Sequence, residues 1–101
     1  MTRHRLDPKI RGKLILMAGL RAARRSGWGS LTREKIAREA GCSDALVSAY
    51  LGSMLKARRR IMRAAIEFKY LDLIAQGIVH GDPLCARISP ILKHEALSSL
   101  K

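Results

Sequence analysis

Residues 31–50, LTREKIAREAGCSDALVSAY, decide the fold of this chain. Thr32 suits a helix N-cap, and the residues after it predict a short helix over about 33–40. Gly41 ends that helix, because glycine adopts the positive φ of a tight turn without a Cβ penalty. A second short helix is predicted over about 44–50. Two short helices joined by a turn that contains glycine are typical of a helix-turn-helix unit.

Four residues inside this segment have the sizes and capping properties that the motif needs. Ala37 is small, which lets the two helices approach each other, and Cys42 serves as a small hydrophobic residue under the turn. Ser43 suits the N-cap of the second helix, and Val47 suits its buried side. The alternative is an ordinary helical hairpin with a glycine corner. The spacing, together with the charge described below, favours the helix-turn-helix.

The residues before the motif predict another helix, over about 9–25. Asp7-Pro8 is typical of a helix start, with Asp as the cap and Pro in the first turn. Apolar residues at helical spacing follow. Gly27 and Gly29 end this helix, and we expect Trp28 between them to fill the core.

After the motif, the pattern predicts one long helix and one short helix. The long helix runs from Met54 to about Gln76 or Val79, and it is apolar on more than one side, which requires burial on more than one side. Ser89-Pro90 predicts the start of a short helix that reaches about Leu100. No segment shows the alternation typical of a strand, so we expect an all-α chain.

The chain has 101 residues, which suits a single domain. Its excess of positive over negative charge is confined to the first 63 residues. Residues 1–25 hold eight basic residues and one acidic one, residues 26–63 hold eight and three, and residues 64–101 hold four and four. The net charge is +12. We expect a helix-turn-helix unit with a basic N-terminal arm over residues 1–53, and helices for packing and oligomerisation over 54–101, within one compact domain.

Arginine is the commoner of the two basic residues, with 13 Arg against 7 Lys. The planar guanidinium group of arginine makes bidentate hydrogen bonds with phosphates and guanines. This preference favours a nucleic acid over an acidic membrane as the polyanionic partner. The longest apolar run has 7 residues, and a membrane span needs about 20, so we expect no membrane partner.

The stretch from Ile15 to about Ala57 resembles the DNA-binding domain of the TetR family of transcriptional regulators. The residues that carry the resemblance are Ile15-Leu16-Met17-Ala18-Gly19, Gly27-Trp28, Leu31-Thr32, Ile36-Ala37 and Ala40-Gly41-Cys42-Ser43. The resemblance implies a TetR-like three-helix helix-turn-helix domain followed by a long helix and a short C-terminal helix.

The chain departs from the family pattern at three positions and in its length. Ser48, Leu51 and Met54 stand where the family has Tyr, Phe and Lys, whereas Tyr50 occupies its Tyr-or-His position. Two usual phosphate contacts, at Ser48 and Met54, are therefore missing. Because few residues follow the predicted long helix, we expect no enclosed pocket and no small-molecule inducer.

In a helix-turn-helix protein of this kind, the second helix of the motif would enter the major groove of DNA. The outward residues expected to contact bases are Asp44, Ala45, Ser48 and Ala49. Ala and the Ser carbon suit a thymine methyl, and the Ser48 hydroxyl suits either base type. Asp44 either accepts from cytosine or completes the cap with Ser43.

Phosphate contacts are expected from residues at the helix starts and from basic side chains. These residues are Thr32, Arg33, Lys35, Ser43, Tyr50, Lys56 and Arg58. Arg3 and Arg5, in the N-terminal arm, would enter a minor groove or follow the backbone. Arg59, Arg60 and Arg63 would also bind phosphate, and a solvated helix face is the alternative for Arg59 and Arg63.

Other chemistry finds little support in the sequence. The three histidines, His4, His80 and His94, have no metal-ligand spacing with each other or with Cys42 and Cys85. No nucleophile–base pattern and no phosphate-cradling glycine loop is visible, so we expect no enzyme, no metal and no cofactor. Two cysteines and no secretory signal suit a reducing cytoplasm, where the protein would associate with the bacterial nucleoid.

The sequence thus predicts a double-stranded DNA-binding transcriptional regulator, acting as a repressor and as a homodimer or higher homo-oligomer. A dimer would read two half-sites about 34 Å apart. A phage or mobile-element origin would suit its small size. Two alternatives remain open: a small terminase-like DNA-packaging subunit, and a basic protein that binds RNA polymerase or RNA.

Overall fold

The computed structural model describes residues 7–100, and that part of the chain is all helical, which confirms the all-α prediction. The elements are α1 (Pro8–Ser26), η1 (Trp28–Ser30), α2 (Arg33–Ala40), α3 (Asp44–Leu51), α4 (Met54–Glu67), α5 (Leu71–Val79), η2 (Cys85–Arg87) and α6 (Pro90–Ser98). None of the described helices is both long enough and apolar enough to cross a membrane.

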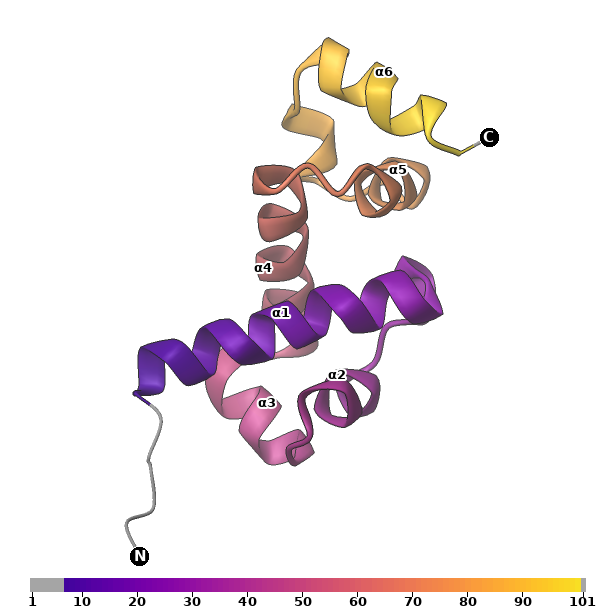
Figure 1. The fold of residues 1–101 in the computed structure, drawn as a ribbon. Helices are drawn as coiled ribbons and strands as arrows, with labels where there is room; N and C mark the ends of the chain where they lie inside the picture. The colour runs from indigo at the N-terminus through magenta and orange to yellow at the C-terminus, as the bar shows by residue number, and fades with distance from the viewer. Residues whose placement is uncertain (1–6, 101) are drawn as a thin grey trace, which may run out of the picture.

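The long helix α1 organises the arrangement (Figure 1). It packs against α2, α3, α4 and α5. The two helices of the predicted motif, α2 and α3, lie on one side of it, and α4 leads away from them toward α5 and α6 at the other end of the molecule. The termini of α2 and α3 agree with the sequence prediction to within one residue.

The predicted N-caps are present as hydrogen bonds. The side chains of Asp7, Thr32, Ser43 and Ser89 accept from backbone N–H groups in the first turns of α1, α2, α3 and α6, at 2.7–3.2 Å. Gly41 ends α2 with φ 69° and ψ 37°. A Cβ at that position would have open space around it, so the left-handed backbone, not crowding, favours glycine there.

The prediction of one long helix from Met54 to residue 76 or 79 is wrong, because the chain bends at Phe68–Tyr70. The Tyr70 N–H donates to the Ala65 carbonyl at 2.8 Å, and the Lys69 N–H donates to the Ile66 carbonyl at 3.2 Å. This pair of bonds is a Schellman motif with Lys69 in the left-handed position, at φ 56°. The sequence lacks the glycine that usually marks such an ending.

The conformational free-energy cost of the bend is offset by contacts that a straight helix would not make. The Arg24 Nε donates to the Asp72 Oδ2 at 2.9 Å, and the Arg24 guanidinium carbon lies 4.8 Å from the centre of the Tyr70 ring. Leu73 and Ile74 are fully buried just after the bend. The burial of these two side chains contributes about 1.5–3 kcal/mol each, which together exceeds the cost of about 1–3 kcal/mol for one non-glycine residue in a left-handed conformation.

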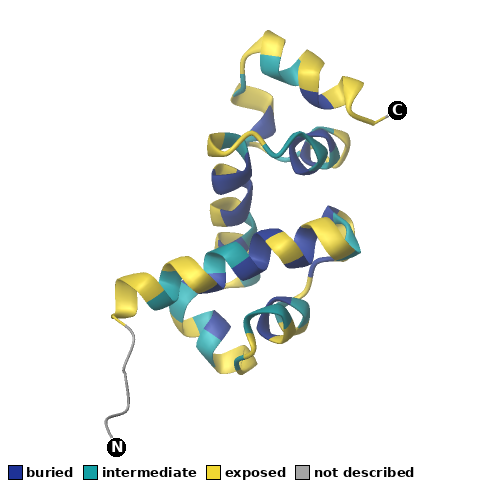
Figure 2. Ribbon diagram, in the orientation of Figure 1, coloured by how far each residue is buried: buried dark blue, intermediate teal, exposed yellow. Residues whose placement is uncertain are grey.

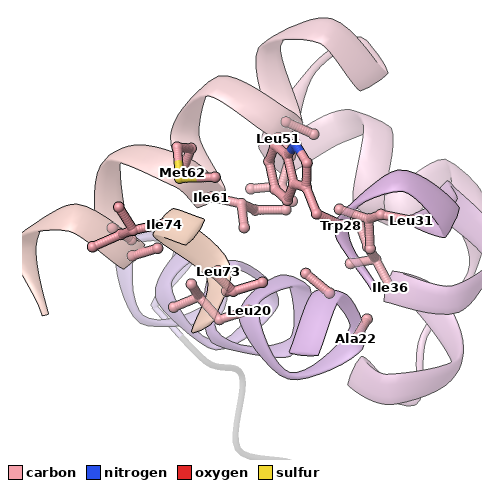
Figure 3. Close-up of a cluster of buried hydrophobic side chains, with 14 of the residues drawn as sticks. Leu20, Ala22, Trp28, Leu31, Ile36, Leu51, Ile61, Met62, Leu73 and Ile74 are labelled. Carbon is pink, nitrogen blue, oxygen red and sulfur yellow. The ribbon is translucent and has the colours of Figure 1, made fainter. Parts of the chain in front are cut away.

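One continuous core joins the helix-turn-helix to the C-terminal helices (Figure 2). Leu20 of α1, Ile36 of α2, Ile61 of α4 and Leu73 of α5 meet in it, as Figure 3 shows. Trp28 is 3% exposed and belongs to the same cluster, which confirms the expectation that it fills the core. Each of these elements therefore depends on the others for its burial.

The approach of α5 to α4 and η2 is close enough to require a glycine. A Cβ built on Gly77 would lie 2.5 Å from the Cys85 Sγ and 2.5 Å from the Met62 Cε. Both neighbours are buried in the core. At Gly12 of α1, by contrast, the nearest atom to such a Cβ is the Tyr50 Cδ1 at 3.4 Å, which is an ordinary contact.

Gly77→Ala should therefore lower the free energy of unfolding by about 1–3 kcal/mol, because the added methyl overpacks the core. Gly12→Ala is the matched control, since it adds the same methyl within a helix that has room for it. It should leave stability unchanged or raise it by up to about 1 kcal/mol through helix propensity. Urea unfolding followed by circular dichroism measures both. A stabilised Gly77→Ala variant would contradict this packing.

Candidate nucleic-acid interface

Helix α3 displays the residues that the sequence assigned to base contacts. Asp44, Ala45 and Ala49 are exposed, and Ser48 is half-buried. The opposite side of the helix is held in the core by Val47 and Leu51, which are 0% and 1% exposed. The exposure of Asp44, Ala45 and Ala49 and the burial of Val47 and Leu51 agree with the predicted faces of this helix, and Ser48 lies between the two faces.

The start of α3 is capped by Ser43 and not by Asp44. The Ser43 Oγ accepts from the Leu46 N–H at 3.1 Å. The Asp44 carboxylate has no hydrogen-bond partner among the described residues, so it projects from the exposed face with its acceptors unused. An oxygen so placed has the chemistry to accept from a cytosine amino group.

The end of α3 is fixed by Tyr50. Its ring is half-buried and lies beside Gly12 of α1, where a Cβ would touch the ring edge at 3.4 Å. Its carbonyl oxygen accepts from the Arg60 Nη1 of α4 at 2.6 Å. These contacts hold the exposed face of α3 in a set orientation relative to α1 and α4.

Lys56 lies at the start of α4, next to the turn at Gly52-Ser53. Gly52 has φ 80° and ψ −152°, a conformation that is essentially reserved for glycine. Ser53 then caps α4 by accepting from the Lys56 N–H at 3.2 Å. The Lys56 side chain runs over Gly52, with its Cδ 3.1 Å from where a Cβ would stand, and the residue is exposed.

At the start of α2, the predicted phosphate-binding residues are partly engaged within the protein. The Thr32 hydroxyl accepts from the Lys35 N–H at 3.2 Å, and the Lys35 Nζ donates to the Ser30 carbonyl at 2.8 Å. Arg33 is half-buried, and its Nε–H is buried without a partner in the described part of the chain. Thr32 itself is exposed.

Arg58 is the predicted phosphate ligand whose charged group makes two hydrogen bonds within the protein. The Nη1 donates to the Trp28 carbonyl at 2.9 Å and the Nη2 donates to the Leu31 carbonyl at 3.1 Å. The guanidinium carbon also lies 5.0 Å from the centre of the Trp28 ring. The sequence contains no signal for this clamp, which joins residues 27 or more positions apart. The structure gives Arg58 a positioning role, holding the loop before α2 against α4.

The basic side chains near α3 and along α4 face few acids. Within residues 7–100 the ion pairs join Glu39 to Arg21 and Arg25, at 3.2 and 3.4 Å, and Asp72 to Arg24, at 2.9 Å. All three arginines belong to the C-terminal half of α1. The other basic residues of the described chain have no ion-pair partner. Arg3 and Arg5 of the predicted arm lie outside the described residues.

For both cysteines, burial raises the pKa of the thiol and so disfavours the nucleophilic thiolate form. Burial raises the pKa of the Cys85 thiol to about 11, and Asp82 acts in the same direction. Burial also raises the pKa of the Cys42 thiol, partly opposed by the Arg11 charge. Within residues 7–100, no three His, Cys, Asp or Glu side chains come together in a way that could hold a metal ion.

Comparisons with protein-family models, with curated proteins and with solved structures gave no match for this chain. The assignment of the interface therefore depends on its geometry and charge.

The role of Arg58 can be separated from that of its neighbour in the chain. Arg58→Ala should lower the free energy of unfolding by about 1.5–3 kcal/mol, because two buried carbonyls lose a charged donor. Arg58→Lys should recover little of the lost stability, because one ammonium group cannot reproduce the hydrogen bonds of the planar guanidinium to both carbonyls. Arg59→Ala, which removes an exposed and unpaired guanidinium, is the control and should change stability by less than about 0.5 kcal/mol. Equal stability of the Arg58→Ala and Arg59→Ala variants in urea would contradict the clamp.

Proposed function

We propose that this protein binds double-stranded DNA in the major groove through α3 and acts as a sequence-specific transcriptional regulator, with repression as its mode. The observation that supports this most is the exposed face of α3. It carries short side chains at Asp44, Ala45, Ser48 and Ala49, on a helix whose other side is locked into the core. Because these side chains are short, the helix backbone can lie close to the base edges in the major groove, which is about 12 Å wide.

The contacts available to this face are those of direct base recognition. The methyl groups of Ala45 and Ala49 suit thymine methyls, and the Ser48 hydroxyl donates to or accepts from a base edge. Thr32 and Arg33 at the start of α2, and Tyr50 and Lys56 on the side toward α4, would contact the flanking phosphates. In this proposal the phosphate contacts orient α3, and the α3 side chains select the sequence.

Selection of bound duplexes from random DNA tests this proposal. We expect an enriched palindromic consensus, and a fall of log K with log salt at a slope of about −0.9 per neutralised phosphate, with about 4–8 phosphates for a dimer. On the selected duplex, Ala49→Glu should weaken binding by about 100-fold or more, because a carboxylate then faces the acceptor-rich groove.

Ala86→Glu provides the control for this substitution, because it makes the same alanine-to-glutamate change on an exposed residue of η2. Ala86 belongs neither to α3 nor to the exposed apolar residues that are proposed below for self-association. The control variant should change DNA affinity only slightly. An equal loss in both variants would mean that binding follows net charge alone. Binding without any enriched sequence would instead favour the packaging or RNA-binding alternatives.

We further propose that two copies associate through the C-terminal half of the chain. Residues 64–101 carry equal numbers of basic and acidic residues, whereas the first 63 residues carry the whole excess charge. Like charges repel, so self-association costs least through the neutral half. That half also exposes large apolar side chains, namely Phe68, Val79, Ile91, Leu97 and Leu100.

Ile91→Glu combined with Leu97→Glu should therefore convert a dimer into a monomer, as measured by light scattering after size exclusion. The matched control is Leu14→Glu with Leu55→Glu, which places the same charges on exposed apolar residues of the basic half. The control should remain dimeric. A wild-type chain that is monomeric at micromolar concentration would refute the dimer.

A further inference from the structure

A groove of about 670 Å³ lies between α4 and the turn that joins α5 to η2. Leu55, Arg59 and Arg63 of α4 form one wall, and Leu84 and Arg87 belong to the other. Trp28 and Gly29 of η1 also line it, whereas no residue of α2 or α3 does. The groove is therefore distinct from the proposed DNA-reading face.

The charge of this groove is strongly positive. Arg58, Arg59, Arg63 and Arg87 line it, and the single lining carboxylate is Asp82. One oxygen of that carboxylate already accepts from the Leu84 N–H at 2.9 Å. Arg59, Arg63 and Arg87 are exposed and form no ion pair within residues 7–100. Like charges gathered in a concave surface raise the local concentration of anions.

The size and the walls of the groove narrow the class of ligand. Small-molecule sites typically enclose about 300–1,000 Å³. Guanidinium groups bind phosphate by bidentate hydrogen bonds, so three unpaired arginines suit a ligand with more than one phosphate. Leu55 and Leu84 supply apolar surface beside them. This combination fits a molecule that carries a chain of phosphates attached to a planar or apolar group.

A ligand in this groove would depart from the expectation of no enclosed pocket and no small-molecule inducer. That expectation assumed a pocket enclosed by the residues after the long helix. The structure instead forms the groove between α4 and the turn after α5, because the bend at Phe68–Tyr70 redirects the chain. A short C-terminal segment therefore supplies one wall, and α4 supplies the other.

We propose that this groove binds a phosphorylated small molecule of nucleotide size, with its phosphates on Arg59, Arg63 and Arg87 and its body against Leu55 and Leu84. This site goes beyond the proposed DNA binding and does not require it. Trp28, the only tryptophan in the chain, lines the groove and reports on its occupancy.

The test uses the full chain with ATP and inorganic tripolyphosphate as probes, measured by calorimetry and by Trp28 fluorescence. We expect saturable binding of one ATP per chain, and weaker binding of tripolyphosphate, which lacks a body to contact the apolar wall. Arg63→Gln with Arg87→Gln should weaken ATP binding by about 10–100-fold, because charge-assisted bonds to phosphate are lost. Neither side chain has a hydrogen bond in the described structure, so the fold should persist.

The control variant, Lys13→Gln with Arg38→Gln, removes the same charge from exposed residues outside the groove. It should bind ATP like the wild type. Equal weakening by the two variants, or no saturable binding by the wild type, would overturn the proposal. It would also be overturned if the groove variant lost affinity for duplex DNA while the wild type bound no ATP, because the arginines would then serve the DNA backbone. If the wild-type chain bound ATP but did not bind duplex DNA, only the proposed regulator would be overturned.

Discussion

The structure depends on how Trp28 is held between the two halves of the chain. Its ring fills the core, its backbone N–H donates to the Gln76 Oε1 of α5 at 2.6 Å, and its carbonyl accepts from Arg58 of α4. One residue of η1 thus contacts both α4, which directly follows the helix-turn-helix, and α5, which lies beyond the bend. Since Arg58 also binds the Leu31 carbonyl, the entry to α2 is fixed by the same contacts. The orientation of the motif relative to the C-terminal helices follows from them.

The bend at Phe68–Tyr70 is the second constraint. A straight continuation of α4 would carry its later apolar residues away from α1 and into solvent. The bend returns Leu73 and Ile74 to the core, where Gly77 allows α5 to approach Met62 and Cys85. About 100 residues bury a limited fraction of their surface, so a chain of this size gains stability by folding back in this way.

Charge is separated in space as well as in sequence. The acids Glu39 and Asp72 neutralise arginines at the C-terminal end of α1, which leaves the cations at the start of α4 and around the groove without carboxylate partners in the described chain. This separation supports two anionic partners at different places. Duplex DNA is proposed for the exposed face of α3, and a phosphorylated small molecule is proposed for the groove beside α4. Self-association is proposed for the exposed apolar residues of the neutral C-terminal half.

The sequence by itself determined most of the helices, their caps and the two faces of α3. These features depend on contacts within a few residues: a serine hydroxyl reaching an N–H three positions on, a glycine with a left-handed backbone, and apolar residues at helical spacing. Only the tertiary structure decided the bend at Lys69, the clamp of Arg58 on Trp28, and the groove lined by Arg63 and Arg87. Lys69 has no intrinsic preference for a left-handed conformation, and it adopts one because the burial of Leu73 and Ile74 in the core compensates the cost. The other two features join residues more than twenty positions apart, and no local pattern records which arginine turns inward and which remains free.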